Sequence, residues 1–231
     1  MKGSKNSNYL KQIELKENMI AALSHEIRNP LNTIKGANKY LNEKFKDIKE
    51  INEFTEIINN EILRIERYLN EFISFSRGIK LKLKTVDPVQ YIKGIVLLAK
   101  YSFNGKIYII EKKQKLPDIT IDVELMRQVL DNLILNAKEA VNEIKNPEIK
   151  IILNCDNKFF YIEVVDNGIG ISKENLKKVF YPFFTTKPNG LGIGLSICKA
   201  IISRHNGNIY LKSNKRAGTT FTIKIPILKG N

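Results

Sequence analysis

The sequence predicts two domains: an all-α antiparallel helical hairpin that forms a four-helix bundle on dimerisation, followed by an α+β sandwich. Three observations lead to this prediction. Over residues 9–77 the apolar side chains recur every three or four positions, which is the spacing of amphipathic helices. Strand-like and helix-like runs then follow one another through residues 79–231, which is typical of helices packed on one face of a sheet. The chain has 231 residues, a length that suits two domains.

The first domain, residues 1–78, begins with a predicted helix over residues 9–45. Its apolar stripe is formed by Leu10, Ile13, Ile20, Leu23, Ile27, Leu31 and Ile34. Pro30 lacks an amide hydrogen and clashes with the preceding turn, so we expect it to kink this helix. Residues 45–50 form a short polar connection.

A second helix is predicted over residues 51–77 and is ended by Gly78. Its apolar stripe is formed by Ile51, Phe54, Ile58, Ile62, Ile65, Leu69, Phe72 and Phe75. Two helices joined by so short a connection make an antiparallel hairpin. A single hairpin cannot bury so wide an apolar stripe, and we therefore expect a homodimer through residues 9–77.

The second domain, residues 79–231, mixes strands and helices. Strands are predicted at residues 80–86, 106–111, 149–155, 159–166, 208–213 and 219–225, and helices at residues 88–101, 123–144 and 193–205. Residues 167–192 are rich in Gly, Pro, Thr and Asn. Long irregular segments in compact domains are usually functional, so this segment is a candidate part of a site.

The charge pattern argues against a nucleic-acid partner. The net charge is +14, from 38 Lys and Arg against 24 Asp and Glu. The lysines are scattered along the chain, and neither an RNP-type aromatic motif nor zinc-finger spacing appears. We therefore interpret most of the charge as solvated surface, with a smaller share available for phosphates and for an acidic partner protein.

The sequence also predicts a cytoplasmic protein. No apolar stretch approaches the roughly 18 residues that a membrane-spanning helix needs, and the first residues do not resemble a signal peptide. If a longer parent protein is anchored in a membrane, the anchor lies outside this sequence. Cys155 and Cys198 lie far apart in apolar surroundings, which predicts free, buried thiols in a reducing compartment.

Five motifs carry the chemistry, and they are Ser24–Pro30, Asp131–Ala137, Asp166–Ile171, Phe180–Lys187 and Gly190–Leu195. In order and spacing they resemble the H, N, G1, F and G2 boxes of bacterial sensor histidine kinases. The resemblance implies a dimerisation and histidine-phosphotransfer domain, then the GHKL (Bergerat) ATP-binding fold of topoisomerase, Hsp90 and MutL ATPases. The Phe-Phe-Thr-Thr-Lys form of the F box is similar to that of the nitrogen-regulatory and sporulation-kinase branch.

Asn132 and Asn136 are four residues apart and share one helix face. An amide oxygen is a hard ligand that suits Mg²⁺. The resemblance implies that Asn136 is the Mg²⁺ ligand and that Asn132 supports it or contacts ribose or phosphate. The alternative is two polar residues on a wet face, which the apolar neighbours Leu130, Leu133 and Ile134 disfavour.

Asp166 ends an apolar strand, where its carboxylate can accept a hydrogen bond from the adenine amino group and reject guanine. Gly168 and Gly170 allow the backbone to approach the base closely. An ordinary Asp-Asn-Gly turn is the alternative. The glycine-rich segment that follows favours a nucleotide. Thr219 resembles the family residue whose hydroxyl supports this carboxylate.

Gly190, Gly192 and Gly194 surround the start of a predicted helix, where backbone N–H groups can bind phosphate. The segment has no Walker-type Lys-Ser/Thr ending, which favours the GHKL type of ATPase over a P-loop. Lys187 either pairs with a phosphate or is an ordinary solvated lysine. We expect residues 167–192 to form a lid over ATP.

His25 is the candidate phosphoacceptor, although a lone helical histidine is more often a surface or core residue. The resemblance implies that the adjacent Glu26 engages the imidazole Nδ1–H, which makes Nε2 more nucleophilic. It also implies that Asn29 orients water for dephosphorylation. We interpret His205, the other histidine, as structural.

The resemblance therefore implies ATP-dependent autophosphorylation of His25, in the same or the partner subunit, with ATP and Mg²⁺ as cofactors. The phosphoryl group would pass to an Asp of a response regulator, and Glu26 with Asn29 would suit a phosphatase activity toward that regulator. One rival class is an ATP-driven clamp or chaperone, which usually carries a catalytic Glu near the N box, where this chain has Asp131. The other rival is a non-enzymatic scaffold, which the complete set of boxes disfavours.

Overall fold

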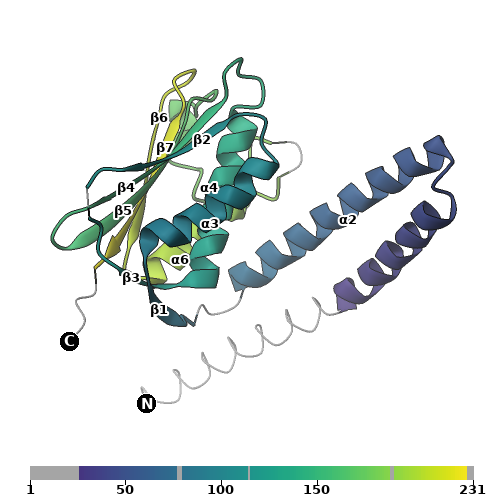
Figure 1. The fold of residues 1–231 in the computed structure, drawn as a ribbon, viewed down its shortest axis with the longest axis horizontal. Coiled ribbons are helices and arrows are strands. Elements are labelled where there is room, and N and C mark those ends of the chain that lie inside the picture. Colours follow the sequence, from purple (N-terminus) through teal and green to yellow (C-terminus); the bar gives the residue numbers. More distant parts are fainter. Residues whose placement is uncertain (1–25, 77–79, 114, 188–189, 228–231) are drawn as a thin grey trace, which may run out of the picture. The chain divides into compact units, whose positions relative to one another are not determined.

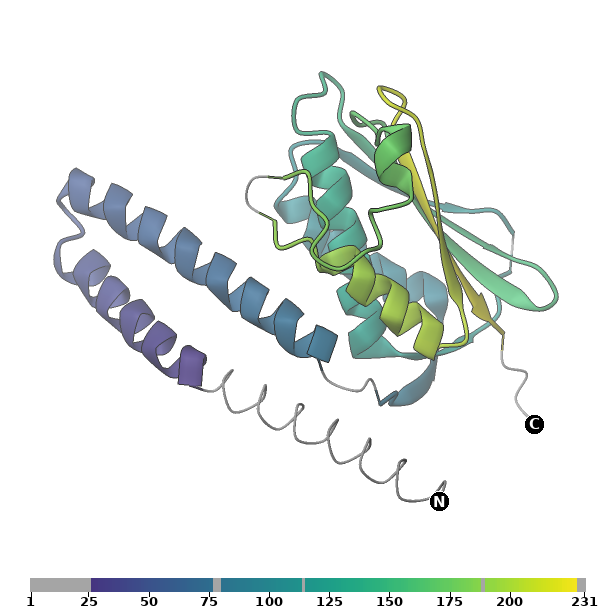
Figure 2. The same ribbon diagram turned by 180° about the vertical axis from the view of Figure 1, so that it is seen from behind.

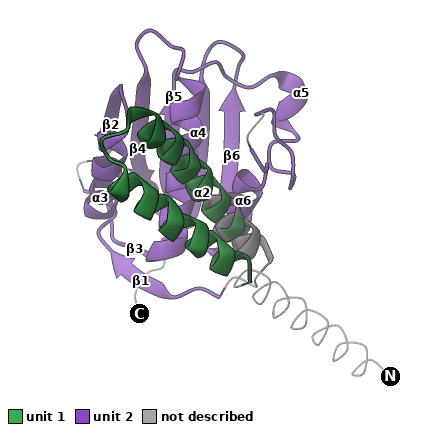
Figure 3. Ribbon diagram, turned by 90° about the vertical axis from the view of Figure 1, so that its right-hand side faces the viewer, with its two compact units in different colours: residues 1–78 green, residues 79–231 purple. Residues whose placement is uncertain are grey.

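The computed structural model of the chain describes residues 26–76, 80–113, 115–187 and 190–227. The chain divides into two compact units, Met1–Gly78 and Ile79–Asn231 (Figure 3). The first unit is helical and the second is a mixed α/β sheet domain. This order of fold types confirms the predicted fold class.

The first unit contains two helices joined by a short turn. The first helix is described over residues 26–44, and the helical assignment continues through Pro30. The second helix, α2 (Lys49–Ser76), begins two residues before the predicted start at residue 51. A side-chain hydrogen bond stabilises the turn: the Asn52 amide donates to the Lys46 carbonyl at 2.6 Å.

Contacts between these two helices show that they run antiparallel. Near the turn, the Asn38 amide donates to the Thr55 carbonyl at 2.8 Å. Further from the turn, Lys35 Nζ meets Glu66 Oε1 at 2.9 Å. Earlier residues of the first helix thus meet later residues of the second. The contact surface includes a buried leucine, Leu31, which is 4% exposed.

The second unit is built on a five-stranded sheet in the order β2-β4-β5-β7-β6, with a separate two-stranded sheet, β1-β3. The strands are β1 (Leu83–Val86), β2 (Lys106–Glu111), β3 (Ile119–Asp122), β4 (Glu148–Cys155), β5 (Phe159–Asp166), β6 (Asn208–Ser213) and β7 (Thr219–Pro226). Strands β2 and β4 are parallel, and all other paired strands are antiparallel.

Three helices, α3 (Pro88–Tyr101), α4 (Val123–Ala140) and α6 (Gly194–Arg204), cover one face of the five-stranded sheet (Figures 1 and 2). Along β4, β5 and β7 every second residue is buried, so one face of each strand packs against the helices. The largest fully buried side chains include Phe160, Ile162, Leu153, Ile149, Leu133, Leu130 and Met126. The apolar core therefore lies between this sheet face and the helices.

Apart from small shifts in bounds and the later start of β1 at Leu83, three elements differ from the prediction. Strand β3 was not predicted, because its four residues are too few to show a period; they are held by antiparallel pairing with β1. The short helix α5 (Lys173–Leu176) lies inside the segment predicted to be irregular. Helix α4 ends at Ala140 rather than near residue 144, because a tighter turn follows in which the Ile144 amide donates to the Val141 carbonyl at 2.9 Å.

His205 joins the end of α6 to the start of α4. The Asp122 backbone N–H donates to His205 Nε2 at 2.9 Å, so the ring proton must lie on Nδ1, which is 2.9 Å from the Ile201 carbonyl. The ring is buried, and both of its nitrogens contact backbone groups. Its contacts are those of a structural residue.

We expect His205→Ala to lower the free energy of unfolding by about 1–3 kcal/mol, because the buried Asp122 N–H would lose its partner. Urea denaturation followed by circular dichroism would measure the change. Ser203→Ala, an exposed change on the same helix, is the matched control and should leave the midpoint in place. Equal midpoints for the His205→Ala variant and the unmodified protein would contradict the structural role.

Candidate functional site

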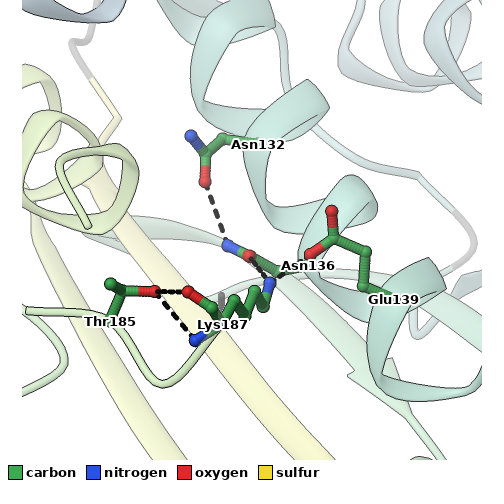
Figure 4. A network of polar contacts seen from close by, with 5 residues as sticks. All are labelled: Asn132, Asn136, Glu139, Thr185 and Lys187. Carbon is green, nitrogen blue, oxygen red and sulfur yellow. Dashed lines mark hydrogen bonds and ion pairs between the residues drawn. The ribbon is translucent and has the colours of Figure 1, made fainter. Parts of the chain in front are cut away.

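Helix α4 presents the two predicted asparagines on its partly buried side. The helix is fixed at its start by Asp122, whose carboxylate accepts from the Leu125 N–H at 3.0 Å. Asn136 Nδ2 donates to Asn132 Oδ1 at 3.0 Å (Figure 4). This contact leaves the carbonyl oxygen of Asn136 directed away from Asn132, where it is available to a cation.

Lys187 approaches this oxygen from a segment about fifty residues further along the chain. Its Nζ donates to Asn136 Oδ1 at 2.8 Å and also forms an ion pair with Glu139 (Figure 4). The Thr185 hydroxyl oxygen accepts from the Lys187 backbone N–H at 3.0 Å and shapes the turn. An ammonium group can only donate, so Asn136 must present its oxygen, and not its nitrogen, on this side.

Glu139 was not predicted from the sequence as a site residue. Its position, three residues after Asn136 on one helix, places it on the same face, and this spacing is the signal that could have found it. Its side chain and that of Lys187 are 42% and 44% exposed. Ion pairs this exposed contribute at most about 1 kcal/mol to stability, so the pair can open at little cost.

The glycine-rich segment lies against the same asparagines. A Cβ atom at Gly194 would overlap the Asn132 side-chain amide, so glycine at this position lets α6 begin beside Asn132 without displacing that side chain. Gly192 has a φ of +68°, in the left-handed region that favours glycine. Gly190 lies beside the Thr185 hydroxyl. The start of α6, whose first N–H groups have no side-chain cap among the described residues, thus borders the asparagine pair and suits an anion.

Asp166 is the second centre of the site. Its carboxylate is 6% exposed, and Oδ1 accepts from the Gly168 N–H at 2.9 Å and from the Thr219 N–H at 3.2 Å. Burial raises the pKa of Asp166 although both N–H bonds act to lower it. Among the described residues no hydrogen bond reaches Oδ2, which leaves one strong acceptor for a ligand.

Thr219 contacts Asp166 through its backbone, and the predicted role of its hydroxyl stays a prediction. The Thr219 hydroxyl lies 3.0 Å from the Ser213 hydroxyl, and the backbone N–H makes the contact with Asp166. The reason is the antiparallel register of β5 and β7, which pairs Asp166 with Thr219 and points the amide at the carboxylate.

The turn after Asp166 packs onto the end of α4. The Ile169 N–H donates to the Ala140 carbonyl at 3.1 Å, and a Cβ at Gly168 would lie 2.5 Å from the same oxygen. Gly170 has a φ of +69° and lies against the Asn214 carbonyl. Because Ala140 is one helical turn beyond Asn136, the Asp166 turn and the asparagine pair border the same stretch of α4.

The candidate phosphoacceptor region belongs to the other unit. His25 lies outside the described residues. Glu26 and Asn29 are exposed on the first helix, and the Asn29 carbonyl accepts from the Thr33 hydroxyl at 3.2 Å. The structure therefore groups the residues predicted to bind the nucleotide within residues 79–231 and leaves the roles of His25, Glu26 and Asn29 as predictions.

The residues present fit a nucleotide with a divalent cation. Asn136 Oδ1 already faces a positive group, the Lys187 ammonium, at 2.8 Å. The carboxylate of the buried residue Asp166 can accept a hydrogen bond from an amino group. The start of α6 offers backbone donors beside Asn132, one helical turn before Asn136 on α4. A cation, a set of phosphates and a base would each find groups of the required kind.

Two family models match the chain. Residues 121–229 match the histidine kinase-, DNA gyrase B- and HSP90-like ATPases, and residues 15–79 match the His Kinase A (phospho-acceptor) domain. No helix in the described part of the chain is both long enough and apolar enough to cross a membrane.

Two curated relatives illustrate the similarity. The sensor histidine kinase ZraS of Escherichia coli (strain K12) is 32% identical over 211 residues, covering 90% of this chain and 45% of the relative. Sporulation kinase D of Bacillus subtilis (strain 168) is 34% identical over 226 residues, covering 96% of this chain and 44% of the relative. The chain thus spans less than half the length of these relatives.

Several solved structures are also similar to this chain. The catalytic domain of histidine kinase ThkA is 30% identical, with a TM-score of 0.56, and covers 64% of this chain and 99% of that domain. ThkA in complex with the response regulator protein TrrA is 28% identical, with a TM-score of 0.67 and coverage of 98% and 66%. Full-length ShkA in complex with AMPPNP shares the fold, with a TM-score of 0.78, 22% identity and coverage of 93% and 47%.

Proposed function

The chain belongs to the sensor histidine kinase family, and from this premise we propose that it transfers the γ-phosphoryl group of ATP to His25 and then to an aspartate of a response regulator. Residues 79–231 form the ATP-binding catalytic domain, with a lid at about residues 167–192. Residues 1–78 form the dimerisation and phosphotransfer hairpin. The observation that supports this most directly is the convergence of Asn136 and Lys187 beside the start of α6.

Each residue of the site has a defined task in nucleotide binding. Asp166 Oδ2 accepts from the adenine amino group, and it rejects guanine, which presents a carbonyl oxygen at that position. Asn136 holds Mg²⁺ through Oδ1, while Asn132 fixes the orientation of the amide. The N–H groups at the start of α6 and the Lys187 ammonium receive phosphate oxygens. Mg²⁺, when bound, neutralises charge on the phosphoryl group during transfer.

In the transfer step, Nε2 of His25 forms a bond to the γ-phosphorus while the bond between that phosphorus and the ADP oxygen breaks. Glu26 accepts the proton from Nδ1 as the ring gains positive charge. Glu26 and Asn29 are both exposed on their helix, where a response regulator could reach them. This exposure also supports a phosphatase activity toward the phosphorylated regulator.

A homodimer through residues 9–77 is part of the proposal. The hairpin leaves large apolar side chains exposed in a single copy: Phe54 is 67% exposed, Ile57 59% and Ile34 51%. Scattered apolar residues on a surface are ordinary, but a hairpin with this many would be poorly soluble alone. A second copy would bury them in a four-helix bundle.

We also propose a response regulator as the partner of the chain and the cytoplasm as its location. The complex of ThkA with TrrA supports a response regulator as the partner. Cys155 and Cys198 are buried thiols that form no disulfide, which fits a reducing compartment such as the cytoplasm. The rival clamp mechanism gains no support at the N box, because the exposed Asp131 carboxylate pairs with Arg127 at 3.4 Å.

Incubation of the purified chain with Mg²⁺ and γ-labelled ATP tests the proposal. We expect a protein-bound label that is lost in acid and retained in base, as phosphohistidine chemistry requires. Release of phosphate without labelling would instead indicate a clamp-type ATPase. Neither labelling nor release, with the domain folded, would indicate a scaffold and overturn the proposal.

A further inference from the structure

The ion pair between Glu139 and Lys187 lies at the oxygen that is expected to bind Mg²⁺. We propose that Glu139 is a positioning residue that holds Lys187 at Asn136 in the absence of nucleotide and thereby makes ATP binding depend on the divalent cation. This inference rests on the proposed function, since it assumes that Asn136 receives the cation and that phosphates lie beside it.

Asn136 is hydrogen-bonded through both the nitrogen and the oxygen of its side-chain amide. Its Nδ2 donates to Asn132 Oδ1 at 3.0 Å, and its Oδ1 accepts from Lys187 Nζ at 2.8 Å. In the structure, the ammonium group therefore occupies the oxygen that a metal ion would need. Mg²⁺ can bind this oxygen only if the ammonium moves away from it.

The negative charge of Glu139 opposes the binding of a phosphate at this place. Its carboxylate projects from the same helix face as Asn136 and is neutralised by Lys187 alone among the described residues (Figure 4). A phosphate group that drew Lys187 away would leave this carboxylate unpaired and facing the incoming negative charge. Lys187 cannot neutralise both groups fully, so metal-free ATP meets a repulsive site.

A divalent cation removes this conflict. Once the cation binds Asn136 Oδ1 and the phosphates, it neutralises part of the phosphate charge, and the repulsion between the phosphates and the Glu139 carboxylate becomes smaller. Lys187 can then stay near the carboxylate or turn to the phosphates. Both side chains are roughly half exposed, so the exchange requires little rearrangement. Glu139 thus favours the metal complex of the nucleotide over the free nucleotide.

The test is the affinity for a fluorescent ATP analogue, measured with Mg²⁺ and again with EDTA, for the full chain and for Glu139→Gln. We expect the variant to bind the metal-free analogue about fivefold more tightly, the effect of one partly exposed charge, with the affinity in Mg²⁺ changed less than twofold. Glu143→Gln is the matched control, because it removes the same charge from an exposed position just beyond α4 and should change neither value.

Two results would overturn the inference. An unchanged ratio of the two dissociation constants in Glu139→Gln would show that the carboxylate does not set the metal dependence. Weaker binding in Mg²⁺ with no change in EDTA would make Glu139 a metal ligand instead. Failure of the proposed function would look different, because the unmodified chain would then bind the analogue in neither condition.

Discussion

Replacement of His25 by glutamine is expected to abolish labelling by γ-labelled ATP completely, while the affinity for ATP stays unchanged. Glutamine keeps a polar side chain of similar size but has no nucleophilic nitrogen. His205, the second of the two histidines of the chain, cannot substitute for it, because its ring is buried and both nitrogens are hydrogen-bonded. Autoradiography of the denatured protein measures the label, and equilibrium binding of a fluorescent analogue measures the affinity.

The unchanged affinity is the internal control, since the nucleotide is held by residues 79–231. Label that persists in the His25→Gln variant would place the phosphoryl group on another side chain and refute the assignment. A mixture with an Asp166→Asn chain adds information about the dimer. Label that reappears on mixing indicates transfer between subunits, and its absence in a verified mixed dimer indicates transfer within one subunit.

Replacement of Asp166 by asparagine is expected to weaken ATP binding by about 100-fold or more while the domain stays folded. The asparagine oxygen can still accept from the N–H groups of Gly168 and Thr219, which bond to Oδ1 in the native protein. Its amide nitrogen would replace Oδ2 and meet the adenine amino group donor to donor, a mismatch that costs far more than a lost contact. Titration with a fluorescent analogue would measure the loss.

The stability of the native chain relative to this variant should depend on pH in a defined direction. Burial raises the pKa of Asp166, so the folded state holds the proton more tightly than the unfolded state does. The stabilisation from this group is complete below the ordinary aspartate pKa and is lost as the pH rises through the folded pKa. Asparagine does not ionise, and the variant should therefore melt at a temperature no lower than the native protein at pH 7.

Asp156→Asn is the matched control, because its expected pH dependence has the opposite sign. The Tyr161 hydroxyl and the N–H groups of Lys158 and Phe159 lower the pKa of Asp156 to about 2. Its stabilisation is present above the ordinary aspartate pKa and is lost as the pH falls through about 2. This variant should lose stability at pH 7 and bind ATP normally. If Asp166→Asn instead bound ATP as the native chain does, Asp166 would not be the adenine acceptor.

The elements that could be predicted are those whose pattern is local. The helix at residues 88–101 and the strands at residues 106–111, 159–166 and 208–213 were predicted with the bounds that the structure has, because each shows a clear apolar period or clear flanking breaks. Strand β3 was missed because its stability comes from pairing with β1, which lies more than thirty residues earlier in the chain.

The parts of the site that could not be predicted depend on contacts between distant segments. The sequence indicates that Lys187 lies in a glycine-rich segment but cannot show that it meets Glu139, 48 residues earlier. In the same way, the motif at Thr219 predicts support for Asp166, but only the register of β5 and β7 shows that the amide provides it. Residue types were predictable, whereas partner atoms were not.

Helices α4 and α6 are joined near both ends of their contact, through His205 and Asp122 at one end and through Gly194 and Asn132 at the other. On the α4 side the two contacts lie at positions 122 and 132. Both can form only if the number of residues between these positions stays the same. Insertion of a single residue there would rotate Asn132 by about 100° and turn it away from the glycine. Natural or engineered changes in length should therefore be excluded from this part of the helix.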